Sequence, residues 1–130
     1  MSEPAAKRAL VAGHGDFAAG LISAVEAVTG RGDLLDPIEV KGLCGEDIQH
    51  LLSDRLKANG ATIIFTDLQA GSCTMAARRL LREMPGVLLV SGANLPMLLD
   101  FVMSSDEAQQ AARAAVERAR TAISIYEAPK

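Results

Sequence analysis

The sequence predicts an α/β protein built on a doubly wound parallel sheet. Short, almost wholly apolar segments alternate with longer amphipathic ones along the 130 residues, which is typical of successive β–α units. The hydrophobic content is 49%, enough for a substantial core. Aromatic residues make up only 3% of the chain, so Ala, Leu and Val must fill the layers between helices and sheet.

Four strands are expected, each followed by a helix. The clearest strand is Ala61 to Thr66, whose β-branched and apolar residues suit the centre of a parallel sheet. The expected strands are Arg8 to Ala12, Pro37 to Val40, Ala61 to Thr66 and Val87 to Val90. The expected helices are Phe17 to Val28, Glu46 to Ala58, Ser72 to Glu83, Asn94 to about Met103, and Ser105 to Arg120. Thr121 to Tyr126 could extend the last helix or form an edge strand.

Local signals mark several helix ends. Asn59-Gly60 is a typical stop for the second helix. Ser72 is expected to be the N-cap of the third helix, and Ser104 or Ser105 that of the last. Pro96 stands near the start of the fourth helix, where its missing N–H costs nothing.

The composition excludes several classes of protein. The net charge is −3, and no basic patch with interleaved aromatic residues suggests nucleic acid. Cys44 and Cys73 are too few for a disulfide framework. No apolar run is long enough to span a membrane, and Met1 to Lys7 lacks the apolar region of a signal peptide. We therefore expect one cytoplasmic domain covering residues 1–130.

Candidate chemistry lies where the strands end, because ligands bind at the carboxyl ends of parallel strands. His14 follows the first strand, between Gly13 and Gly15. A phosphoryl group on its ring could accept hydrogen bonds from the N–H groups that begin the following helix. Taken alone, the histidine is explained better as a residue that caps a turn, since a single His carries little information.

Two further residues strengthen the functional interpretation of His14. Asp67 ends the strand expected beside the first one. Its carboxylate could accept the Nδ1–H bond, fix the tautomer and leave Nε2 as the nucleophile. Ser72 could hold phosphoryl oxygens through its hydroxyl. A turn aspartate and a structural helix cap remain the alternatives for these two residues.

Other patterns are weaker. Residues 13–18 fit G-x-G-x-x-A, the dinucleotide fingerprint, but Glu39 is the nearest acid for a ribose and no substrate domain is expected. In a phosphoacceptor receiver domain, His14 would occupy the place of the metal-binding acidic pair. His14, Asp67, Cys73 and Cys44 lack the spacing of a zinc motif, and the G-x-S-x-G of a serine hydrolase is missing around Ser72.

Three blocks together resemble the enzyme IIA domain of the mannose-type (mannose/fructose/sorbose) sugar phosphotransferase system. They are Gly13-His14-Gly15-Asp16-Phe17-Ala18-Ala19-Gly20-Leu21, Thr66-Asp67-Leu68-Gln69-Ala70-Gly71-Ser72 and Ser91-Gly92-Ala93-Asn94-Leu95-Pro96-Met97-Leu98-Leu99. Each block alone is weak, but the three in this order are specific and cover nearly the whole chain.

The resemblance implies a flavodoxin-like sheet of strand order 2-1-3-4 and a homodimer that exchanges a C-terminal antiparallel strand, here Thr121 to Tyr126. It implies a phosphotransferase in which His14 is phosphorylated at Nε2, Asp67 orients His14 and Ser72 contacts the phosphoryl group. The donor would be the phosphocarrier HPr and the acceptor a IIB component on a separate chain, with the membrane reached only through transporter components. No metal or cofactor is implied.

The chain departs from the family pattern in one block. The family often has Gly-Gly-Ser-Pro where this chain has Ala70-Gly71-Ser72-Cys73. Losing the proline leaves the helix start less fixed, but no chemical group of the mechanism is removed. A regulatory phosphoprotein without a transport role is the alternative function, and the sugar cannot be named from this chain.

Overall fold

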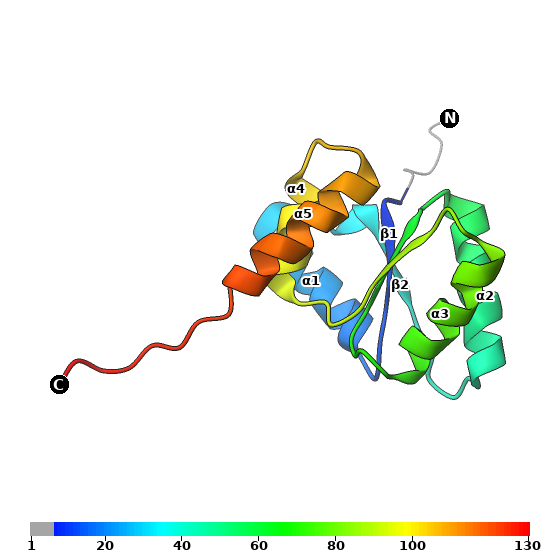
Figure 1. Ribbon diagram of the computed structural model, residues 1–130, viewed down its shortest axis with the longest axis horizontal. Coiled ribbons are helices and arrows are strands. Elements are labelled where there is room, and N and C mark those ends of the chain that lie inside the picture. Colours follow the sequence, from blue (N-terminus) through cyan, green and yellow to red (C-terminus); the bar gives the residue numbers. More distant parts are fainter. Residues whose placement is uncertain (1–6) are drawn as a thin grey trace.

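The four strands form one parallel sheet. In the computed structural model, which describes residues 7–130, the strand order is β2-β1-β3-β4 (Figure 1). The strands are β1 Ala9–Ala12, β2 Leu35–Ile38, β3 Ile63–Thr66 and β4 Leu88–Val90. The order predicted through the family resemblance is therefore confirmed. The expectation for the segment Met1 to Lys7 concerns mostly residues 1–6, which lie outside the described residues.

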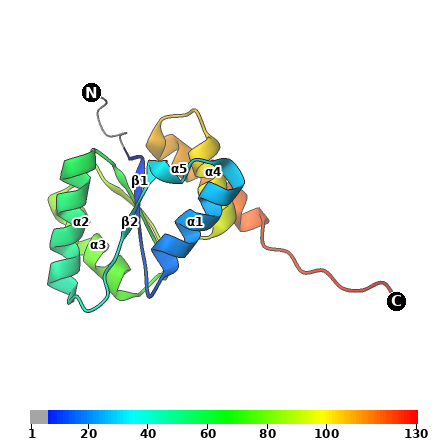
Figure 2. The ribbon, with the colours of Figure 1, turned by 180° about the vertical axis from the view of Figure 1, so that it is seen from behind.

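Helices cover both faces of the sheet. They are α1 Phe17–Thr29, α2 Gly45–Asn59, α3 Ser72–Glu83, α4 Leu95–Met103 and α5 Ala108–Thr121, with a short 3₁₀ helix at Gly32–Leu34. Helices α2 and α3 lie on one face and α1, α4 and α5 on the other, as the views from both sides show (Figures 1 and 2). The arrangement is the doubly wound α/β fold that the sequence predicts.

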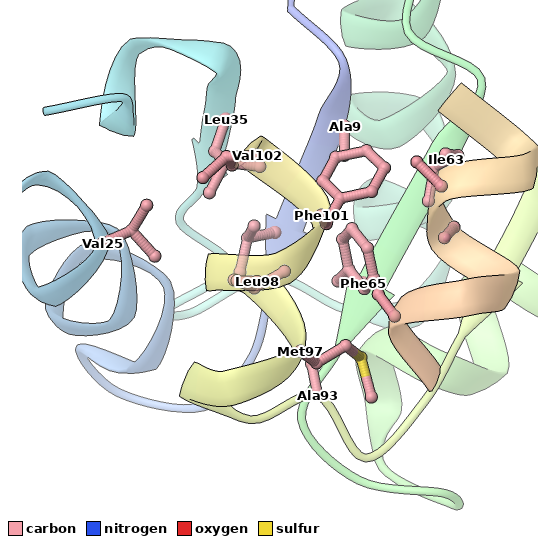
Figure 3. Close-up of a cluster of buried hydrophobic side chains, with 14 of the residues drawn as sticks. Ala9, Val25, Leu35, Ile63, Phe65, Ala93, Met97, Leu98, Phe101 and Val102 are labelled. Carbon is pink, nitrogen blue, oxygen red and sulfur yellow. The ribbon is translucent and has the colours of Figure 1, made fainter. Parts of the chain in front are cut away.

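The core consists of two apolar layers, one on each side of the sheet. Because side chains alternate along a strand, Val11 and Phe65 enter the layer under α1, α4 and α5, whereas Leu10 and Ile64 enter the layer under α2 and α3. In the first layer Phe65 meets Phe101 of α4 edge to face, with ring centroids 5.1 Å apart (Figure 3). Strands β1 and β3 are fully buried. The residues that follow them are therefore attached to tightly packed strands.

The start of β2 differs from the prediction of Pro37 to Val40. The strand begins two residues earlier, at Leu35, and ends at Ile38. Asp36 lies inside the strand, and its carboxylate is paired with Arg55 at 2.5 Å and Asn59 at 2.8 Å, both on α2. Such pairing makes a buried carboxylate acceptable, and Pro37 is tolerated because β2 is an edge strand.

The start of the last helix also differs from the prediction. Helix α5 begins at Ala108 rather than Ser105, so the expected caps Ser104 and Ser105 are wrong. Glu107 is the N-cap, and its carboxylate accepts hydrogen bonds from the backbone N–H groups of Gln109 and Gln110. These hydrogen bonds, of which the one from Gln109 has the larger effect, hold the pKa of the Glu107 carboxyl below its ordinary value. An acidic side chain therefore performs the capping that serine was expected to perform.

The C-terminal segment after α5 is neither helix nor strand. Thr121 ends α5, and residues 122–130 extend away from the body of the molecule (Figure 1). Ile123 is 76% exposed, and Ile125 and Tyr126 are each 90% exposed. The strand that the family resemblance implies at Thr121 to Tyr126 is thus not formed within this single chain. Among residues 7–130, no helix has both the length and the apolarity needed to cross a membrane.

Candidate active site

His14 and Asp67 come together because their strands are neighbours. Strands β1 and β3 pair in parallel, with Ala12 opposite Thr66. His14 and Asp67 leave these strands at the same sheet edge, and the structure places their side chains in contact. The proximity expected from the order of the strands is therefore found.

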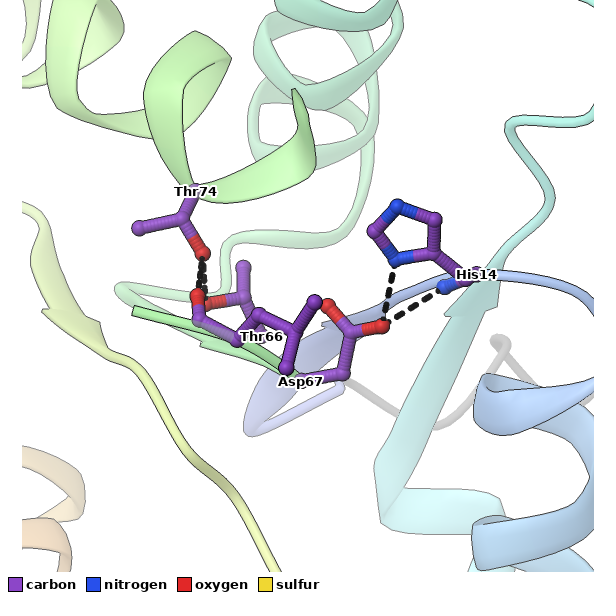
Figure 4. Close-up of polar contacts among 5 residues, drawn as sticks. His14, Thr66, Asp67 and Thr74 are labelled. Carbon is purple, nitrogen blue, oxygen red and sulfur yellow. Dashed lines mark hydrogen bonds and ion pairs between the residues drawn. The ribbon is translucent and has the colours of Figure 1, made fainter. Parts of the chain in front are cut away.

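One carboxylate oxygen of Asp67 binds His14 twice. Oδ2 lies 2.7 Å from Nδ1 of the imidazole and accepts a 2.8 Å hydrogen bond from the backbone N–H of His14 (Figure 4). A carboxylate can only accept, so Nδ1 carries the proton and Nε2 keeps its lone pair. The His14 side chain is 57% exposed, while that of Asp67 is 10% exposed. The largely buried carboxylate of Asp67 thus holds the accessible imidazole of His14, with Nε2 on the edge of the ring away from Asp67.

The Asp67 carboxyl is held in its ionised form. Burial by itself raises its pKa, because a charge is poorly solvated there. The hydrogen bonds from the His14 backbone and ring, together with the positive charge that His14 carries when it is protonated, outweigh burial and bring the pKa of Asp67 below its ordinary value. The second oxygen, Oδ1, is buried without a hydrogen-bond partner among residues 7–130. Asp67 is therefore an anion directed at the histidine.

Two threonines anchor the loop that carries Asp67. The Thr74 hydroxyl of α3 lies 2.6 Å from the Thr66 hydroxyl and also donates to the backbone carbonyl oxygen of Leu68 (Figure 4). Thr66 and Thr74 are both buried. Since these bonds flank Asp67 on both sides, they fix the loop to the start of α3. Neither threonine was expected at the site, although Thr66 ends the clearest predicted strand and Thr74 lies in the first turn of the helix that follows it.

Two glycines leave room for the pair. A Cβ on Gly13 would lie 2.9 Å from the Asp67 carboxyl carbon and 2.5 Å from a ring carbon of Phe17. A Cβ on Gly71 would lie 2.9 Å from Cε1 of His14. Real Cβ contacts are almost never this short, so both positions need glycine for close packing. The ring of His14 consequently lies against the residue that precedes α3.

The start of α3 differs from the prediction in one respect. Gly71, not Ser72, is the N-cap, and Ser72 is the first residue of the helix. No side chain caps this end, and the first N–H groups of a helix have no partner within it. An anion beside His14 would therefore meet free N–H groups and the positive end of the helix dipole.

Ser72 shares a surface groove with His14. The groove has a volume of about 510 Å³ and includes residues from the loops after β1 and β2 and from the start of α3. Lys41, on the loop after β2, lines the same groove. Cys73 is buried, and burial together with the charge of Asp67 raises the pKa of its thiol. That thiol stays protonated, so it is not a nucleophile of this site.

Adding a methyl group at Gly71 should disturb the ring without harming the fold. The backbone there has φ −75° and ψ 170°, which any residue adopts. We expect Gly71→Ala to displace the His14 ring and to slow by about tenfold the phosphorylation of His14 that the family resemblance implies, because small misplacements of a reacting group are costly. Labelling rates and thermal unfolding check this. Gly86→Ala, where a Cβ meets nothing within 4 Å, is the matched control, and equal rates in both variants contradict the expectation.

The fold is similar to those of solved phosphotransferase-system proteins. The mannose/sorbose specific IIA subunit from Enterococcus faecalis superposes with a TM-score of 0.83 at 19% identity, over 96% of this chain and 98% of that chain. The component EIIA from Streptococcus agalactiae gives a TM-score of 0.79 at 21% identity, over 91% and 95% of the two chains. At these identities the likeness shows the fold alone. No curated protein matches the sequence.

The sequence itself carries the family assignment. Residues 8–119 match the family model described as PTS system fructose IIA component, where PTS is the phosphotransferase system. The match extends from the start of β1 almost to the end of α5, so it includes every strand and helix that surrounds the His14–Asp67 pair. The chain therefore belongs to the EIIA-man family of phosphotransferase-system IIA components.

Proposed function

We propose that this IIA component carries phosphoryl groups on Nε2 of His14, which accepts them from phosphorylated HPr and passes them to a IIB component. The observation that carries the proposal is the 2.7 Å bond between Nδ1 and buried Asp67, which directs the other nitrogen of an exposed ring outward. In this role the chain acts as a single cytoplasmic domain during sugar uptake.

The proposed transfer needs no proton movement at the reacting atoms. The Nε2 lone pair of neutral His14 attacks the phosphorus in line, a P–N bond forms, and the P–N bond to the donor histidine breaks. The donor imidazole leaves with the electron pair of its broken bond. His14 then carries the phosphoryl group and a positive ring, which Asp67 stabilises through the Nδ1–H bond. Reversal of the same steps with a IIB side chain discharges His14.

Ser72 and the start of α3 are proposed to hold the phosphoryl oxygens. Ser72 lines the groove that contains His14, and Gly71 lies so close to the ring that a Cβ there would be 2.9 Å from Cε1, the carbon next to Nε2. The uncapped N–H groups of the helix offer hydrogen bonds that match the charge of the transferring group. Since the groove is open, the phosphoryl group stays accessible to the next protein.

The proposal is tested by labelling. The purified chain is incubated with the donor enzymes, HPr and labelled phosphoenolpyruvate. We expect one acid-labile phosphoryl group per chain, because a P–N bond hydrolyses readily in acid, and discharge of the label when a IIB component is added. A chain that takes up no label from phosphorylated HPr contradicts the proposal.

We further propose that two copies exchange their C-terminal segments. Strand β4 is at the edge of the sheet, and beside it a hollow of about 400 Å³ is lined by Leu88, Val90 and residues of α5. The segment that follows α5 carries three exposed apolar side chains, those of Ile123, Ile125 and Tyr126. Pairing of this segment with β4 of a second copy would cover both the edge and the apolar side chains.

Removing the segment should therefore remove the dimer. We expect the full chain to sediment as a dimer and a chain ending at Thr121 to sediment as a monomer that remains folded, since α5 is complete. Analytical ultracentrifugation and circular dichroism check these expectations. If both chains show the same association state, strand exchange is not what joins the copies.

A further inference from the structure

The direction of the Asp67 carboxylate depends on the path of its backbone. Within residues 7–130, His14 is the single other residue that donates a hydrogen bond to this carboxylate, and both of its bonds go to Oδ2. The second oxygen, Oδ1, is buried without a partner among the same residues. No further side chain therefore aims the carboxylate at Nδ1, and the backbone that carries Asp67 has to do so.

Thr74 holds that backbone on both sides of Asp67. Its hydroxyl lies 2.6 Å from the hydroxyl of Thr66, the residue before Asp67, and donates to the carbonyl oxygen of Leu68, the residue after it (Figure 4). A hydroxyl has one proton and a carbonyl oxygen can only accept. The Thr74 proton therefore goes to Leu68, and Thr66 supplies the proton of the other bond. The result is one directed chain of hydrogen bonds across the loop.

This chain of hydrogen bonds joins two packed elements. Thr66 and Thr74 are both buried, so bulk water does not replace a bond that is lost there. Thr66 ends β3, and its backbone carbonyl accepts a 2.9 Å hydrogen bond from the N–H of Ala93, after β4. Thr74 belongs to α3, which packs against the sheet through a row of small buried side chains. The backbone around Asp67 is therefore held to both the sheet and α3.

We propose that Thr74 is a positioning residue for phosphoryl transfer at His14. This inference rests on the proposed function of His14. By fixing the backbone on both sides of Asp67, Thr74 keeps Oδ2 within hydrogen-bond distance of Nδ1. The hydrogen bond that an imidazole makes sets which of its nitrogens carries the proton. A loosened Asp67 would let the proton occupy Nε2 in part of the molecules, and those molecules have no lone pair for the attack.

Replacing the Thr74 hydroxyl by a methyl group tests the proposal. For Thr74→Val, we expect the transfer rate at saturating phosphorylated HPr to fall about tenfold, because a misplaced reacting group is costly. The HPr concentration that gives half the maximal rate should change less than about twofold, since docking is untouched. Thr74→Ser keeps the hydroxyl and should restore the wild-type rate. Thr66→Val leaves the bond to Leu68 in place and should have a smaller effect.

The tautomer of His14 provides a readout that a general loss of stability would not change. The unphosphorylated chain, labelled with ¹⁵N in histidine, is examined by NMR at mildly alkaline pH. We expect the proton on Nδ1 in the wild type and in Thr74→Ser, and partly on Nε2 in Thr74→Val. This measurement needs neither HPr nor a phosphoryl group, so it tests the positioning role separately from the proposed function.

Thr29→Val is the matched control. The Thr29 hydroxyl also donates to a backbone carbonyl, that of Val25 at 2.8 Å, and accepts a 3.0 Å hydrogen bond from the N–H of Arg31. Thr29 is the last residue of α1, whereas His14 precedes the first residue of that helix. The control should lower the temperature of thermal unfolding through its lost hydrogen bonds, and it should leave the transfer rate and the His14 tautomer unaltered.

The opposite results would overturn the proposal. A wild-type rate and tautomer in Thr74→Val would show that Asp67 is positioned without Thr74. Equal slowing in Thr74→Val and Thr74→Ser, or in Thr29→Val, would trace the effect to stability alone. If Thr74→Val does not fold, Thr66→Val takes its place, and an unchanged rate and tautomer in that variant would overturn the proposal. If the wild type takes up no label, the proposed function is wrong, and the tautomer comparison alone decides the role of Thr74.

Discussion

Replacing His14 by glutamine is expected to abolish phosphorylation of the chain by phosphoenolpyruvate and the donor enzymes. Glutamine keeps a polar side chain of similar reach, but its amide nitrogen has no free lone pair and cannot form the P–N bond. Asp67 would still accept the backbone N–H bond of residue 14, so the loop should keep its place. Incorporation of label measured over time gives the result directly.

The chain supplies a matched control for this variant. His50, the second of its two histidines, is exposed on α2. His50→Gln should take up label at the wild-type rate. Label retained by His14→Gln, or lost from His50→Gln, contradicts the assignment of His14.

Replacing Asp67 by asparagine should slow phosphoryl acceptance by about 10² to 10⁴. The amide has nearly the shape of the carboxylate, but it has no negative charge to stabilise the positive ring of phosphorylated His14. An amide N–H facing Nδ1 would also favour the tautomer with its proton on Nε2, which removes the nucleophile. Single-turnover transfer from phosphorylated HPr measures the effect. A rate within about twofold of wild type would show that Asp67 does not orient His14.

The same variant should change the dependence of stability on pH. The pKa of Asp67 in the folded chain is lower than its ordinary value of 3.8, so ionised Asp67 stabilises the fold. That contribution is fully present above the ordinary value and is lost as the pH falls through the lowered one. Urea unfolding at about pH 7 and about pH 3 should therefore show the difference between wild type and Asp67→Asn shrinking in acid. A difference in stability between the two proteins that grows in acid would contradict the expected stabilisation by ionised Asp67.

The order of strands and helices could be predicted because it depends on local patterns. Apolar runs and helical spacing indicate each of the four strands and five α-helices, and the ends of α1, α2 and α3 lie within one or two residues of the predictions. The start of β2 was missed because a charged Asp36 inside a strand depends on Arg55 and Asn59 of another element. The start of α5 was missed because serine is a preferred N-cap residue and Ser104 and Ser105 stand just before the helix, whereas Glu107 performs the capping in the structure.

Strand order alone was enough to predict one part of the candidate site. His14 and Asp67 end strands that must be neighbours in a doubly wound sheet, so their proximity follows from topology. The lack of room for a Cβ between Gly71 and the imidazole and the bond of Thr74 to the Leu68 carbonyl depend on the path of a loop. Local sequence does not determine such a path, because the packing of α3 on α2 and β3 sets it.

The position of the phosphoryl group on the ring distinguishes the two nitrogens of His14. The bond to Asp67 occupies Nδ1 and so leaves Nε2 to react. The chain labelled with ¹⁵N in histidine, phosphorylated through HPr, and examined by ¹⁵N and ³¹P NMR should show phosphorus bonded to Nε2 of His14, with Nδ1 still protonated. Phosphorus bonded to Nδ1 of His14, or to any other residue, would contradict the account.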